Sequence, residues 1–204
     1  MAKIKKRIFS IISFLFIIGI SATPCLAITL LTEKEALRRL FPSADEVVVE
    51  KKNISDAQLN TVKTRLEEKL VNYEKSRTAK QIIQQKEFDF YFAIENGKKS
   101  GVAIILEEPG KWGPIEFIVK LNLEGVIGEV IVMRYTETRG RPIARRSFLK
   151  QFAGKTAKDT FKLRKDIVAV SGATISSGAA AFTVKKAIVL YEELYLRNIQ
   201  SSVK

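Results

Sequence analysis

Residues 171–178, SGATISSG, place four hydroxyl side chains and two glycines directly before a long segment with helical spacing. The first turn of a helix has free N–H groups and a partial positive charge, so it suits a phosphate group. In that interpretation Gly172 lets the backbone approach a ligand, and the Thr174 hydroxyl lies against its phosphate. The same residues also suit a simpler structure, in which Gly172 forms a turn and Thr174 or a following serine caps the helix.

A second polar stretch, residues 135–142 with the sequence YTETRGRP, follows a predicted strand. Thr138 and the backbone of Gly140 would line the polar edge of a ligand there, beside the carboxylate of Glu137. Arginines at positions 139, 141, 145 and 146 make this segment strongly basic. Such a segment suits docking of an acidic partner or of membrane headgroups, and a solvated charged loop is the alternative.

The composition excludes several kinds of chemistry. The 204 residues include no histidine and a single cysteine, Cys25. An imidazole base, a His-ligated zinc and a His-ligated haem are therefore excluded, and neither a disulfide nor a thiolate metal site is expected. We assign no catalytic residue and no metal ligand. The chemistry must come from carboxylates, hydroxyls, backbone amides or a bound organic cofactor.

The N-terminus has the layout of a secretory signal. Four basic residues precede an apolar run from Ile8 to Ile20, and Cys25-Leu26-Ala27 follows a small, polar stretch. The run is shorter than the roughly 20 apolar residues of a membrane span. We predict a signal peptide over residues 1–27, with an uncleaved N-terminal anchor as the alternative. The protein is then exported, to the periplasm or the outer face of the cytoplasmic membrane, where no nucleic acid partner is expected.

Helices are predicted near both ends of the chain. Thr32 and Ser55 each begin a segment with a helix-capping pattern. A third, long helix is predicted to start at Ser176 or Ser177, and we interpret Lys185 and Lys186 on it as solvated surface charges. Residues 148–152 are predicted to form a short helix.

The middle of the chain is predicted to form a sheet. Residues 46–52 and 167–170 are predicted strands, and four consecutive strands follow Phe88, with hairpin turns at Asn96-Gly97 and Glu124-Gly125. The fold class is therefore α+β, a mainly antiparallel sheet with flanking helices. We expect a single domain over residues 86–197, after an N-terminal helical and strand extension over residues 28–85.

The motif Ser171-Gly172-Ala173-Thr174, preceded by a predicted strand and followed by a helix, resembles the flavinylation motif of the FMN-binding domain family. That family includes the covalent-flavin subunits of the Rnf-type electron-transport complex and of the sodium-pumping NADH:quinone reductase. The resemblance extends to the strand pair that leads into ETRG at 137–140 and to FLKQFAGK at 148–155. It covers roughly residues 85–195.

The resemblance implies that FMN is esterified through its phosphate to Thr174 by a separate flavin transferase. The other implied cofactor-binding residues are Ser171, Gly172, Ala173, Ser177, Glu137, Thr138 and Gly140, with Tyr135 as a candidate wall of the flavin site. The implied function is an exported electron carrier that exchanges electrons with membrane or periplasmic redox proteins. An electron-transfer protein is favoured over a stand-alone enzyme, because the chain has no nicotinamide-binding Gly-rich fingerprint.

The sequence departs from the family pattern at two positions. The family has Asp six residues before the acceptor Thr, where this chain has Val168, and the nearest acid is Asp166. Arg139 replaces the Pro of the family's Glu-Thr-Pro-Gly, which removes a fixed φ. The alternative function is therefore a module of the same fold that binds FMN non-covalently or binds no flavin.

Overall fold

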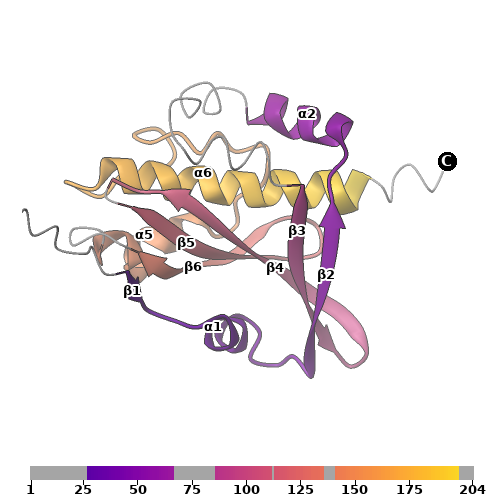
Figure 1. Cartoon of the computed structure of the whole chain (residues 1–204). Coiled ribbons are helices and arrows are strands. Elements are labelled where there is room, and N and C mark those ends of the chain that lie inside the picture. Colours follow the sequence, from indigo (N-terminus) through magenta and orange to yellow (C-terminus); the bar gives the residue numbers. More distant parts are fainter. Residues whose placement is uncertain (1–26, 67–85, 112, 136–140, 198–204) are drawn as a thin grey trace, which may run out of the picture.

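The computed structural model describes residues 27–66, 86–111, 113–135 and 141–197 (Figure 1). In this part the chain forms one six-stranded antiparallel sheet of order β1-β6-β5-β4-β3-β2. The strands are β1 (Ile28–Thr29), β2 (Glu46–Asn53), β3 (Glu87–Glu95), β4 (Lys98–Pro109), β5 (Pro114–Leu121) and β6 (Ile127–Tyr135). The predicted α+β fold with an antiparallel sheet and flanking helices is confirmed.

The helical elements flank this sheet. They are α1 (Glu33–Leu40), α2 (Asp56–Arg65), η1 (Arg141–Ala144), α5 (Arg146–Leu149), η2 (Lys150–Phe152), α6 (Thr174–Tyr191) and η3 (Glu192–Leu196). No helix within these described ranges combines the length and the apolar composition that crossing a membrane requires. The predicted signal segment, residues 1–27, lies outside the described residues apart from Ala27.

The predicted capping patterns form as expected. The Thr32 side chain accepts a hydrogen bond from the Glu35 N–H, and the Glu35 carboxylate accepts one from the Thr32 N–H at 2.8 Å. Ser55 and Gln58 make the same reciprocal pair at the start of α2. These capping boxes satisfy N–H groups that the first turn of a helix leaves open, so both helix starts are encoded locally.

The predicted hairpins also form. Asn96 and Gly97 have φ of 51° and 71°, the left-handed pair that a two-residue β-hairpin turn requires. β3 and β4 pair on either side of this turn, and β5 and β6 pair on either side of Glu124-Gly125. The two hairpins therefore supply the four central strands.

The two faces of the sheet are covered differently. Figure 1 shows α6 lying across one face with α2 beside it, and α1 on the opposite face. The α6 face holds the larger core, which includes Phe90, Phe117 and Val119 from the sheet. A smaller core joins α1 to Tyr91 and Ile118 on the other face. Because α6 is buried on most sides, its position relative to the sheet is closely defined.

The N-terminal part of the chain supplies both edges of the sheet. β2 pairs with β3 over eight residue pairs, and β1 pairs with the end of β6 through Ile28 and Thr29. The two-residue strand β1 was not predicted from the sequence. The strands of residues 28–66 thus complete the sheet whose centre is built from residues 87–135.

Candidate functional site

Residues 171–178 form a turn and the first turns of α6. Gly172 has φ of 75°, and a Cβ added to it would meet nothing within 4 Å. The helix begins at Thr174, with Ala173 as its N-cap residue. The Ser177 N–H donates to the Ala173 carbonyl at 2.8 Å, which makes the first helical bond. The prediction that the helix starts at Ser176 or Ser177 was therefore wrong by two residues or more.

The hydroxyl groups of this motif differ in exposure. Ser171 and Thr174 are exposed, whereas Ala173 and Ser177 are buried. The Ser177 hydroxyl accepts a hydrogen bond from the Val170 N–H at 3.0 Å and donates to the Ala173 carbonyl at 2.9 Å. Ser177 thus holds the turn that presents Thr174, and a direct contact between Ser177 and a cofactor stays a prediction.

The loop before the motif is organised by Asp166. Its carboxylate accepts hydrogen bonds from the Thr160 hydroxyl at 2.9 Å and from the N–H groups of Phe161 and Lys162 at 2.7 and 2.6 Å. Burial raises the pKa of Asp166, but these hydrogen bonds outweigh it and hold the pKa below its usual value. The acid nearest to the family's Asp position is therefore engaged in the loop's own structure.

Residues 167–170 do not form the predicted strand. Only Ile167 makes a bridge, to Leu163. The Val168 N–H donates to Gln151 Oε1 at 2.8 Å, and Gln151 Nε2 donates to the Val168 carbonyl at 3.3 Å. Because a glutamine side chain takes both backbone groups of Val168, no strand can pair there. The Val168 side chain is 78% exposed, so the position of the family's Asp faces solvent.

An aromatic cluster ties this loop to the short helices α5 and η2. The ring centroids of Phe148 and Phe152 lie 5.7 Å apart with an interplanar angle of 90°, and those of Phe152 and Phe161 lie 6.5 Å apart at 14°. Phe152 and Phe161 are fully buried. The predicted short helix at 148–152 is present as the end of α5 and η2, and it supports the loop that leads to Thr174.

The basic stretch after β6 is described only in part. Glu137, Thr138 and Gly140 lie outside the described residues, so their predicted contacts with a cofactor stay predictions. Tyr135, just before them, is buried, and its hydroxyl has no hydrogen-bond partner among the described residues. Downstream of them η1 contacts α6. The segment therefore leaves the sheet at Tyr135 and returns against the helix that carries Thr174.

Lys186 was wrongly predicted to be a solvated surface charge. Its Nζ donates to Glu108 Oε1 at 2.9 Å, and the two side chains are 3% and 0% exposed. The pair joins α6 to β4 inside the larger core. Helical spacing contained the signal, because Lys186 lies three residues after the buried Thr183 and four before the buried Leu190.

Comparison with known proteins identifies the domain. Residues 110–189 match the FMN-binding domain family. The structure resembles NqrC of Shewanella oneidensis with a TM-score of 0.50 and 19% identity, covering 85% of this chain and 92% of that one. The corresponding component of the Na(+)-translocating NADH-quinone reductase of Parabacteroides distasonis gives a TM-score of 0.47 and 16% identity, over 82% and 83% of the two chains. No curated protein matches the sequence.

The first of these structures shows a shared fold, and the family match includes residues 171–174. The geometry fits the phosphate end of FMN: an exposed hydroxyl lies at the first position of a helix, and open space surrounds the preceding Gly172. The expected resemblance and the expected cofactor are both confirmed. Residues 110–189 of this chain are therefore an FMN-binding domain of that family.

Proposed function

We propose that this chain is an exported flavoprotein that carries FMN on Thr174 and relays electrons to or from a membrane redox system. The observation that supports it most is the placement of Thr174. Its side chain is exposed at the first position of α6, after a left-handed glycine and a buried alanine. An acceptor hydroxyl must be reached by a modifying enzyme, and this one lies on the surface of a rigid helix end.

The chain's own residues would hold the phosphate end of the cofactor. The N-terminus of α6 stabilises the negative charge that a phosphoester keeps. Ser177 holds the turn between Val170 and Ala173, and Gln151 holds the backbone of Val168. When bound, the flavin supplies one-electron and two-electron exchange. A covalent link suits an exported protein, because a cofactor that dissociates outside the cytoplasm is lost.

Replacing Thr174 by alanine is expected to abolish covalent flavin completely, because the ester needs the Thr174 Oγ1 atom. The protein is expressed together with a flavin transferase, and flavin is measured by ultraviolet fluorescence on a denaturing gel and by intact mass. Ser171→Ala is the matched control, since it removes an exposed hydroxyl three residues away and should keep the flavin. Fluorescence that survives Thr174→Ala would contradict the assignment.

Replacing Val168 by aspartate is expected to raise the initial rate of flavin attachment, by roughly tenfold if one ion pair or charge-assisted hydrogen bond to the transferase is gained. The change restores the family's acid, and the exposed side chain can accept it without loss of packing. The rate is followed by fluorescence over time with a limiting amount of transferase. Val168→Asn is the uncharged control. An unchanged or lower rate in Val168→Asp would show that the transferase does not read this position.

A second candidate function is a module that binds FMN non-covalently or serves as a flavin-free interaction domain. The exposed valine at position 168 and the engagement of Asp166 in its own loop favour it. The intact mass of the protein from its native cell distinguishes the two. Attached FMN adds the mass of the nucleotide minus water, and the same spectrum reports whether residues 1–27 have been removed.

A further inference from the structure

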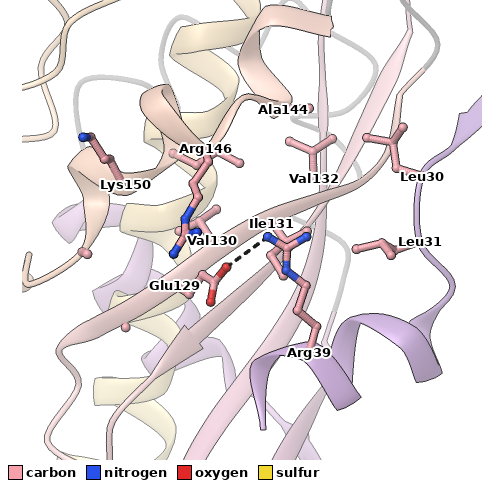
Figure 2. A pocket seen from close by; sticks show the side chains of 13 residues that line it. Leu30, Leu31, Arg39, Glu129, Val130, Ile131, Val132, Ala144, Arg146 and Lys150 are labelled. Atoms are coloured by element: carbon pink, nitrogen blue, oxygen red, sulfur yellow. Dashed lines mark hydrogen bonds and ion pairs between the residues drawn. The ribbon is translucent and has the colours of Figure 1, made fainter. Parts of the chain in front are cut away.

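A cavity of about 380 Å³ lies between β6, α1 and α5, on the far side of the short helices from Val168 (Figure 2). Five consecutive residues of β6, 128–132, line it. Successive side chains of a strand point to opposite faces of its sheet. A run of five consecutive lining residues therefore means that the backbone edge of β6, and not one of its faces, opens into the cavity.

The pairing of β6 leaves this edge available. On the cavity side, β1 pairs only with Arg134 and Tyr135, and the Leu30 and Leu31 N–H groups reach the Met133 carbonyl. At the other end Ile127 exchanges hydrogen bonds with Gly154 and Lys155. Between these two points, within the described part of the chain, no strand pairs with the outer edge of β6. The gap is long enough for a short added strand.

The cavity is apolar at its base and basic at its rim. Leu30, Leu31 and Leu149 contribute apolar surface. Figure 2 shows Arg146 pointing from α5 toward β6, and Arg39 reaching from α1 to Glu129. The Arg39–Glu129 pair is 3.5 Å long. Together with Lys150, the rim has three cations and one carboxylate, which leaves two positive charges (three minus one).

The cavity lies close to the flavin-bearing loop along the chain and in space. Lys150 and Ala153 line the cavity, and Gln151 between them binds the backbone of Val168. A molecule in the cavity is therefore separated from the loop before Thr174 by the thickness of one short helix. A docked partner would be held next to the redox site without covering Thr174.

We propose that the β6 edge docks an extended, acidic segment of a partner protein as an added strand. Backbone hydrogen bonds to residues 128–132 would supply affinity, and Asp or Glu side chains would pair with Arg146 and Lys150. An anionic lipid headgroup would match the same cations, but it would leave the strand edge unused. The open edge therefore favours a peptide.

The test selects binders from a library of short peptides that alternate apolar and acidic residues, with the Thr174→Ala protein as well as the wild type. Because this docking needs no flavin, its outcome is separate from that of the proposed cofactor attachment. Selected peptides should slow hydrogen exchange of the amides at 128–132. Arg146→Glu with Lys150→Glu should weaken binding by roughly tenfold or more. Lys34→Glu with Lys98→Glu, which changes the net charge equally on exposed residues elsewhere, should not.

Backbone chemistry separates strand addition from simple charge attraction. A selected peptide with alternate amides N-methylated keeps its charges but cannot pair as a strand, so its binding should be lost. Equal binding of the methylated peptide would overturn the proposal, and so would failure to select any peptide that prefers the wild type to the Arg146/Lys150 variant. Binding confined to vesicles of anionic phospholipid, with the same dependence on those two residues, would assign the surface to the membrane instead.

Discussion

Replacing Lys186 by methionine is expected to lower the free energy of unfolding by about 3–5 kcal/mol. The variant removes the cation that neutralises the Glu108 carboxylate inside the core, where both side chains are almost fully buried. Methionine fills a volume similar to that of the lysine stem, so the loss reports the uncompensated charge and not a cavity. Urea unfolding followed by circular dichroism measures the change.

The double variant Lys186→Met with Glu108→Leu is the decisive partner of this experiment. Replacing a buried ion pair by apolar residues of similar volume is often neutral or stabilising, so the double variant should recover most of the lost stability. Lys185→Met is the matched control on the neighbouring, partly exposed lysine, with an expected change within about 0.5 kcal/mol. A single variant as stable as the wild type would show that Glu108 does not depend on this partner.

Replacing Phe152 by alanine is expected to cost about 3–5 kcal/mol of stability, because a fully buried ring is removed from between two other rings. The effect should reach the loop that carries Val168. Phe152 stacks against Phe161, whose N–H donates to Asp166. Loss of the ring should therefore increase proteolytic cleavage at residues 160–170 and slow flavin attachment to Thr174.

Phe152→Leu keeps most of the apolar volume and serves as the control for this prediction. It should lose less stability than the alanine variant and keep the loop resistant to protease. Limited proteolysis with mass spectrometry locates the cleavage, and flavin fluorescence gives the attachment rate in the same samples. A destabilised Phe152→Ala protein with unchanged cleavage at 160–170 would show that the loop is held without the aromatic cluster.

The features predicted correctly from the sequence are those that a few neighbouring residues determine. Thr32 with Glu35 and Ser55 with Gln58 form capping boxes, and Asn96-Gly97 forms a tight turn, because each needs only contacts within its own segment. The resemblance of residues 171–174 to a flavinylation motif likewise depended on a short, contiguous pattern, and the family match over 110–189 confirmed the family.

The features that were missed depend on distant residues. β1 exists because Ile28 and Thr29 meet the end of β6, which no local pattern indicates. Residues 167–170 look like a strand in isolation, but Gln151 occupies the backbone of Val168. Lys186 belongs to a Lys-Lys pair that suggests a solvated face, and only its partner on β4 makes its burial possible. Glu137, Thr138 and Gly140 were predicted at the site and remain predictions.

The pairing of β1 with β6 is expected to be the last step of folding. Ile28 and Tyr135 are 107 residues apart (135 minus 28), whereas the strands of each central hairpin meet across a short turn. Distant contacts carry a larger loop-closure entropy and form more slowly than local ones. The central four strands can therefore assemble while the N-terminus is still free. Whether residues 1–27 are removed or retained should change when β1 docks, and not whether the sheet forms.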